Sequence, residues 1–304
     1  MTANLTLGPI LFHWDADKKR DFYARVADEA PVEVIYLGEV ICSKRSPFFE
    51  RHYPEVIERL ERGGKRVVLS TLSEVVLPRE RRVTTDLCGQ TDYPVEINNA
   101  AGLSEVDGHP HYVGPMMNVY NERTLAHHAC HGAVHFTLPV ELPRVAAKAL
   151  ARFAVDLGVT VEVQVFGRAS LALSARCYHA RAHRRTKDEC QFVCKEDPDG
   201  MTLRTLGGDN MLAINGIQTL SYSYVNLIAE IDDMRTLGIS HYRLMPHSTD
   251  IVAVATIFKD RIAGHTDAAE AAALLSVKHI GAPFSNGFWH GIAGHRYLST
   301  SGFA

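Results

Sequence analysis

Short apolar segments alternate with amphipathic segments along most of this chain, and this alternation restricts its possible folds more than any other feature. Segments 32–37 and 66–70 are rich in β-branched residues, and segment 54–63 between them has its apolar residues on one helical face. This order is typical of β-α units that form a parallel sheet. The predicted strands are 9–12, 32–37, 66–70, 95–98, 111–113, 134–138, 161–166 and 242–246, and the predicted helical segments are 17–28, 54–63, 75–77, 127–131, 146–156 and 222–237.

About eight such units predict a closed (β/α)8 barrel of the TIM-barrel type. A chain of 304 residues is long enough for this barrel, which needs about 250. An open, doubly wound sheet is the competing fold, but no Gly-x-Gly-x-x-Gly sequence begins a helix after the first strand. We therefore expect one barrel-like domain over residues 1–304.

The alternation stops at about residues 167–220. This stretch contains Cys177, Cys190 and Cys194, a basic run at 181–185, a turn at 197–200 and a hairpin strand at 201–204. No Pro- or Ser-rich linker flanks it, so it is predicted to be an elaboration of the barrel and not a separate domain. Because barrels place their chemistry at the C-terminal ends of their strands, we expect this insertion to lie at the mouth.

Charge and composition limit the function classes. The net charge of −3 gives no general attraction for nucleic acid or for an anionic membrane. No run of eighteen apolar residues predicts a membrane span, and the first residues do not have the pattern of a signal peptide. We expect a cytoplasmic protein, in which clustered cysteines usually indicate metal or redox chemistry and not disulfides.

Four cysteines have a spacing that suggests a shared metal. Cys190 and Cys194 are separated by three residues, Cys177 lies upstream of them, and Cys42 lies just past a predicted strand. Thiolates favour zinc, an iron–sulfur cluster or copper. The chain lacks the paired Cys-x-x-Cys knuckles of most structural zinc sites, whereas iron–sulfur sites combine a tight run with a remote ligand. The same spacing is also compatible with buried cysteines that bind no metal, so the spacing alone does not distinguish a metal site from unligated thiols.

Five segments resemble the collagenase-like peptidase family. Segments 36–45 (YLGEVICSKR), 174–177 (SARC) and 189–194 (ECQFVC) carry the cysteines, and segments 238–246 (GISHYRLMP) and 286–291 (NGFWHG) resemble later blocks of that family. The likeness is to members that act in ubiquinone biosynthesis and extends over essentially the whole chain.

The resemblance implies a cofactor and a partner. It implies that Cys42, Cys177, Cys190 and Cys194 ligate a [4Fe–4S] cluster. It also implies a heterodimer with a related cluster-carrying subunit that hydroxylates aromatic quinone precursors without oxygen, with prephenate as the oxygen source. Because four cysteines would satisfy every iron, we expect an electron-transfer or organising role for the cluster.

The chain departs from the family pattern at one block. Family peptidases and RNA hydroxylases tend to carry a His-Gly-Ala/Ser-Leu/Met-Cys block where this chain has FGRASL at 166–171. No His-Glu-x-x-His or Gly-x-Ser-x-Gly occurs either. We therefore do not expect a peptidase, and we assign no catalytic residue. The alternative functions are RNA-base hydroxylation and a zinc-stabilised scaffold.

Other polar residues have both a functional and a structural interpretation. His127, His128, Cys130 and His131 could bind zinc on a helix, although helical histidines are more often solvated or packed. Cys88 and Cys130 are expected to be buried and unligated. The basic run 181–185 could receive an anionic substrate or an acidic partner, or remain a solvated loop. Glu162 could orient groups at the mouth or point into the barrel. Trp289 and His290 could line a ring-binding pocket, although packing is the simpler role for Trp289.

Overall fold

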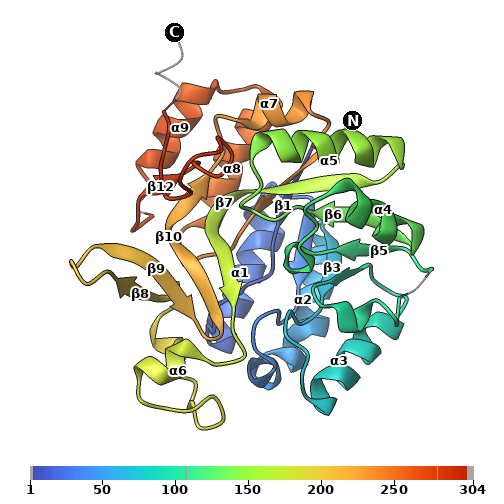
Figure 1. Ribbon diagram of the computed structural model, residues 1–304, viewed down its shortest axis with the longest axis vertical. Helices are drawn as coiled ribbons and strands as arrows, with labels where there is room; N and C mark the ends of the chain where they lie inside the picture. The colour runs from blue at the N-terminus through green and yellow to red at the C-terminus, as the bar shows by residue number, and fades with distance from the viewer. Residues whose placement is uncertain (1–2, 107, 279, 300–304) are drawn as a thin grey trace.

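The computed structural model describes residues 3–106, 108–278 and 280–299. Eight parallel strands close into a barrel, because β11 pairs with both β1 and β7 (Figure 1). The predicted fold class is therefore confirmed. The barrel strands are β1 (Asn4–Leu7), β2 (Val34–Leu37), β3 (Arg66–Ser70), β4 (Val95–Ile97), β5 (His111–Val113), β6 (Ala133–Thr137), β7 (Thr160–Leu173) and β11 (His241–Leu244).

Helices surround the barrel and bury an apolar face against its strands. In α2 the buried side chains Val56 and Leu60 are one turn apart and the opposite face is charged, as the periodicity of the segment predicts. The α-helices are α1 (Ala16–Glu29), α2 (Tyr53–Arg62), α3 (Pro78–Gly89), α4 (Glu122–Cys130), α5 (Arg144–Asp156), α6 (Tyr178–Ala182), α7 (Ile231–Thr236), α8 (Ile251–Ala263) and α9 (Ala268–Ser276). None of the described helices is both long and apolar enough to cross a membrane.

Strand β7 continues past the barrel and carries an antiparallel extension. Its C-terminal half pairs with β10 (Gln218–Asn226), which pairs with β9 (Asn210–Asn215), which in turn pairs with β8 (Met201–Arg204). A two-residue strand, β12 (Phe284–Ser285), pairs with β10. The α6 segment and the β8–β9 hairpin project together from one end of the molecule (Figure 1). They belong to the stretch between residues 167 and 220 where the β-α alternation stops.

Three element predictions are wrong. Residues 9–12 are buried but follow the first strand, because Pro9 has no N–H for a strand ladder and β1 ends at Leu7. Residues 75–77 are not helical: Leu77 is extended, the conformation favoured before a proline, and α3 begins at Pro78. The predicted helix 222–237 is the end of β10 followed by α7, since its aromatic and serine residues alternate with the period of a strand.

Candidate metal centre

Four cysteines from three distant segments line one small cavity. Cys42 precedes the 3-10 helix η1 (Ser43–Phe48) and Cys177 precedes α6. Cys190 lies before η5 (Val193–Glu196), and Cys194 lies in it. All four contribute to the lining, together with Lys44, Arg45, His179, Lys187, Phe192, Val193 and Gly216. The folded chain thus brings together the residues that the sequence pattern grouped. Whether they ligate a metal stays a prediction.

Local backbone geometry shapes the loops that carry these cysteines. Gln191 and Phe192 have φ angles of 47° and 54°, in the left-handed region that non-glycine residues seldom adopt. This strained turn reverses the chain between Cys190 and Cys194. On the opposite wall, the Glu39 carboxylate accepts the backbone N–H of Cys42 at 3.0 Å and so fixes the loop after β2.

Positive side chains surround the thiols. The Lys44 Nζ atom lies 3.8 Å from the Cys190 sulfur and donates to the carbonyls of Lys187 and Asp188. Arg45 is 1% exposed and interacts with the Cys194 thiol. Its Nε atom is buried without a hydrogen-bond partner among the described residues. This charge distribution suits an anionic group held by thiolates, because each thiolate brings a negative charge into a buried site.

Burial keeps the Cys42 and Cys194 thiols protonated when no metal is bound. It raises the pKa of Cys42 to about 11, although Arg45 acts in the opposite direction. Burial also raises the pKa of Cys194, again against Arg45. Metal binding requires thiolates, so any metal that binds here must displace protons from these two side chains.

The cysteine sulfurs of the described chain do not have the close spacing of a single zinc site. Four sulfurs around zinc each lie about 2.3 Å from the metal, which places them within about 4 Å of one another. Among the described residues, no three of the cysteines have sulfurs that all lie within 4.8 Å of one another. The free space between them is about 20 Å³, room for little more than one water molecule. A thiolate-held cluster would use this donor set and its charges, and its entry would require these side chains to turn outward.

A histidine-carboxylate pair lies beside the cysteines. His179 is fully buried, and its Nε2 atom lies 2.9 Å from the Asp197 carboxylate. Its Nδ1 atom is buried without a partner among the described residues. His183 stacks on His179, and one ligand atom from each of these three residues lies within 4.8 Å of the other two. Asp197 therefore fixes the orientation of a histidine that lines the cysteine cavity.

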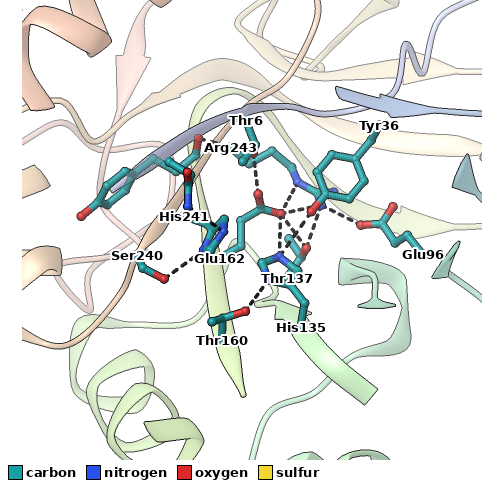
Figure 2. A network of polar contacts seen from close by, with 12 residues as sticks. Thr6, Tyr36, Glu96, His135, Thr137, Thr160, Glu162, Ser240, His241 and Arg243 are labelled. Atoms are coloured by element: carbon teal, nitrogen blue, oxygen red, sulfur yellow. Dashed lines mark hydrogen bonds and ion pairs between the residues drawn. The ribbon is translucent and has the colours of Figure 1, made fainter. Parts of the chain in front are cut away.

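The barrel interior contains a buried ion-pair network (Figure 2). Arg243 on β11 donates through Nε to Glu162 at 2.6 Å and through Nη2 to Glu96 at 2.7 Å. Glu162 also accepts hydrogen bonds from Thr6 and Thr137. Burial alone would raise the pKa of Glu162, but the Arg243 and His135 side chains outweigh it and hold the pKa well below its usual range. Glu162 thus points into the barrel, and its neighbours satisfy its hydrogen bonds. This agrees with the structural interpretation of Glu162.

A larger cavity of about 340 Å³ opens above this network. Its lining comes mainly from residues at and beyond the C-terminal ends of the strands, the face where barrel enzymes place their active sites. Arg243 and Thr137 belong to both the network and the cavity. The remaining lining residues are Leu11, Pro115, Met116, Asn118, Tyr120, Leu138, Pro139, Val140, Glu141, Gln164, Arg168, Ser170, Leu171, Ala172, Leu173 and Met245.

A chain of hydrogen bonds connects the two cavities. Arg45, at the cysteines, donates to the Asn215 side chain at 3.0 Å. The Asn215 amide donates to Gln218 at 3.1 Å, and Gln218 donates to Ser170 at 2.9 Å on the wall of the larger cavity. An apolar cluster that includes Leu11, Ile41 and Met245, with Cys177 packed against it, fills the space beside this chain. One layer of side chains therefore separates the cysteines from the barrel mouth.

Other candidates from the sequence lie away from both cavities. Cys88 is buried as expected, but Cys130 is exposed, because it occupies the last turn of α4 on its solvent face. His131 bonds the carbonyl of His127 through Nδ1, and the histidines of α4 form no group of three closely spaced ligand atoms within the described chain.

The remaining two predictions concern the basic run and the C-terminal aromatic residues. Arg181 and Arg184 are exposed beside the cysteine segment. Trp289 packs in the core and is 3% exposed, in agreement with the structural reading. His290 bonds Glu230 at 2.9 Å and does not line the mouth cavity.

Sequence reasoning missed Arg45, Arg168, Arg243 and Glu96. A signal was present for two of them, because Arg243 and Glu96 are charged residues inside short apolar strands. Charged residues are rarely buried unless they pair with a residue of opposite charge. No comparable signal marks Arg168, whose environment comes from β10, more than fifty residues away.

These features define a (β/α)8-barrel protein with a thiol-lined cavity beside the barrel mouth. The model of peptidase family U32 matches residues 105–295, which is more than half of the chain. The chain therefore belongs to peptidase family U32, which agrees with the resemblance to the collagenase-like peptidases.

The chain also has weak similarity to solved structures. A type I 3-dehydroquinate dehydratase from Clostridium difficile, with covalently modified comenic acid, is 10% identical and is matched over 95% of this chain and 78% of that one. The TM-score is 0.23, so this likeness carries no argument about fold or function.

Proposed function

We propose that this protein is the iron–sulfur subunit of an oxygen-independent hydroxylase that acts on ubiquinone precursors. The observation that carries the proposal is the meeting of Cys42, Cys177, Cys190 and Cys194 at one cavity beside Lys44 and Arg45. Segments that are 135 residues apart in the sequence supply these thiols. Thiols that bind no metal do not have to lie at one cavity, whereas a cluster with four cysteine ligands requires all four to lie close together.

The resemblance to the ubiquinone biosynthesis protein UbiV supports the finer assignment. It suggests a heterodimer with UbiU, a related cluster-carrying protein, and prephenate as the oxygen source. Membership of family U32 supports the broad placement. The expected location remains the cytoplasm, where the cysteines stay reduced.

The residues of this chain would hold and tune the cofactor. A bound [4Fe–4S] cluster would supply one-electron transfer. The four cysteine side chains would hold it, and Lys44 and Arg45 would balance their negative charges. The apolar layer around Leu11 and Met245 would keep water from passing between the cysteines and the barrel mouth.

Iron analysis of a cysteine variant tests this proposal. Protein purified without oxygen should be brown and contain close to four irons and four sulfides per chain. Cys190→Ala should lose most of the iron, because it removes one ligand from the tight pair. Cys130→Ala is the matched control, since this exposed thiol lies outside the cavity, and it should keep full iron content. Full iron in Cys190→Ala would refute the ligand assignment.

Two alternatives predict different results from the same preparation. The exposed Arg181 and Arg184 make RNA-base hydroxylation the second candidate, and it predicts salt-sensitive RNA binding. A zinc-stabilised scaffold predicts colourless protein that contains zinc, although the spread of the sulfurs does not favour it. Metal analysis and an RNA-binding measurement at two salt concentrations separate the three functions.

A further inference from the structure

We propose that the mouth cavity binds a small carboxylic acid with an apolar body, and that Arg168 anchors its carboxylate. This inference rests on the proposed function, from which it takes the reaction. It adds the class of substrate that the barrel would bind for that reaction. The cavity volume of about 340 Å³ is in the range of small-molecule sites, about 300 to 1,000 Å³.

Arg168 is a buried cation for which the described residues supply no carboxylate partner. Four arginines of the described chain are buried: Arg45, Arg168, Arg243 and Arg261. Each of the others has a carboxylate oxygen within 4.0 Å, but Arg168 has none among the described residues. A buried charge without a counter-ion is costly. An anionic ligand would therefore gain more binding free energy at Arg168 than at the other buried arginines.

The present contacts of Arg168 hold it in place without neutralising it. Its Nη1 atom donates to the carbonyls of Ser221 and Tyr222. The guanidinium carbon lies 4.7 Å from the ring centre of Tyr224. Its Nε atom is buried with no hydrogen-bond partner in the described chain. Arg168 is 7% exposed and lines the cavity, so it places a fixed positive charge at the cavity wall.

The charges elsewhere in the cavity place the carboxylate at Arg168. Arg243 on the floor is already shared between the carboxylates of Glu96 and Glu162. Glu141 on another wall is negative and is bonded by Tyr120. A second carboxylate on the ligand would meet one of these groups and be repelled.

The walls define the rest of the ligand. Leu11, Met116, Leu138, Leu171 and Met245 supply mostly apolar surface. Gln164 donates to the Gly167 and Arg168 carbonyls, so the strand that carries Arg168 is held firmly. A ring or short hydrocarbon body would fill this space. A phosphate dianion would gain little from these walls.

The first test compares two probes of equal shape. 4-Hydroxybenzoate and the neutral 4-hydroxybenzamide are titrated by calorimetry into the full chain, with iron content measured on the same sample. The acid should bind at least about tenfold more tightly than the amide, because a charge-assisted hydrogen bond is lost with the charge. Equal affinities would overturn the inference, as would displacement of the acid by equimolar inorganic phosphate.

The second test is a variant series. Arg168→Gln should weaken binding of the acid about tenfold or more and leave the amide unchanged. Arg168→Lys should recover part of the affinity, and Arg152→Gln, on the exposed face of α5, should bind like the unaltered protein. Unchanged affinity for the acid in folded Arg168→Gln would overturn the assignment. If this variant does not fold, the comparison of the two probes on the unaltered protein decides.

Methyl NMR of labelled methionines locates the bound probe. The Met116 and Met245 signals should shift on addition of 4-hydroxybenzoate, whereas Met201 and Met211, on the β8–β9 hairpin, should not. Shifts confined to the hairpin would overturn the site. Iron-loaded protein that binds no acid would refute this inference alone, whereas iron-free protein that binds the acid in the mouth would refute only the proposed function.

Discussion

Arg243 shows how one residue can organise the interior of the barrel. Its guanidinium is 1% exposed and pairs with carboxylates from two other strands. The ring of Tyr36 lies 3.8 Å from the guanidinium carbon. Buried pairs of this kind contribute little net stability compared with apolar residues, but they become very costly when one partner is removed. The network therefore fixes the strands to one another and constrains the floor of the mouth cavity.

Removing one charge from this network should destabilise the protein. Glu162→Gln leaves Arg243 with a single carboxylate, and we expect the free energy of unfolding to fall by about 3 kcal/mol or more. Urea denaturation at pH 7 measures it. Glu58→Gln, in an exposed i,i+4 pair with Arg62, is the control and should change stability by less than about 0.5 kcal/mol.

The pH dependence of that difference follows from the pKa of Glu162. Arg243 holds the folded pKa below the ordinary value of 4.5, against the effect of burial. The charged carboxylate therefore stabilises the fold above that ordinary value, and this contribution is lost as the pH falls toward the folded pKa. The difference between the unaltered protein and Glu162→Gln should be constant from about pH 5.5 to 8 and shrink below about pH 4.5. A difference that grows on acidification would contradict this assignment.

At the scale of elements, the turn between β9 and β10 positions the cysteine cavity. Gly216 has a φ angle of 63°, and a Cβ atom there would lie 2.7 Å from Nη2 of Arg45. The neighbouring Asn215 holds the same guanidinium. This hairpin, which comes from the elaboration, thus sets the position of a side chain from η1.

Gly216→Ala should disturb both stability and metal binding. We expect a loss of about 1–3 kcal/mol, from backbone strain and displacement of Arg45, together with reduced iron content. Gly208→Ala is the matched control, because Gly208 also has a positive φ but has open space around its Cβ position. It should lose stability through the backbone alone and retain its iron. Thermal unfolding and iron analysis of both variants give the comparison, and equal iron loss in the two would argue against a role for the contact with Arg45.

At the scale of the whole molecule, the cysteine cavity joins the elaboration to the barrel. The segment between Cys177 and Cys194 has only short helical turns and no strand. Lys187 holds it to the barrel side by pairing with Glu74 at 2.8 Å. Just beyond this segment, Trp14 donates a hydrogen bond to the carbonyl of Pro198. A metal centre held by Cys42 and the three downstream cysteines would close this long loop far more firmly.

Metal removal should therefore loosen this segment before it affects the barrel. Trypsin should cut at Arg184 or Arg185 faster in chelator-treated protein than in iron-loaded protein, because local opening sets the rate of cleavage. Mass spectrometry of the early fragments locates the sites. Cleavage at helix positions such as Arg152 serves as the internal control and should not change. Equal rates at Arg184 and Arg185 with and without iron would show that no metal holds the segment.

The sequence by itself determined the β-α order and the four cysteines that could share a metal. Period and composition are local properties, so helices such as α2 and strands such as β3 could be predicted from them. Residues 222–237 were misread because alternating tyrosines and serines at the end of β10 precede a true helix.

Only the tertiary structure decided which polar groups meet. Barrel closure places Arg243 between Glu96 and Glu162. The return of β10 along β7 places Arg168 beside Tyr224, with no carboxylate partner among the residues that the structure describes. The same closure brings Cys42 to three cysteines far along the chain. Charge pairing, burial and ligand geometry depend on distances in space, and sequence separation does not specify those distances.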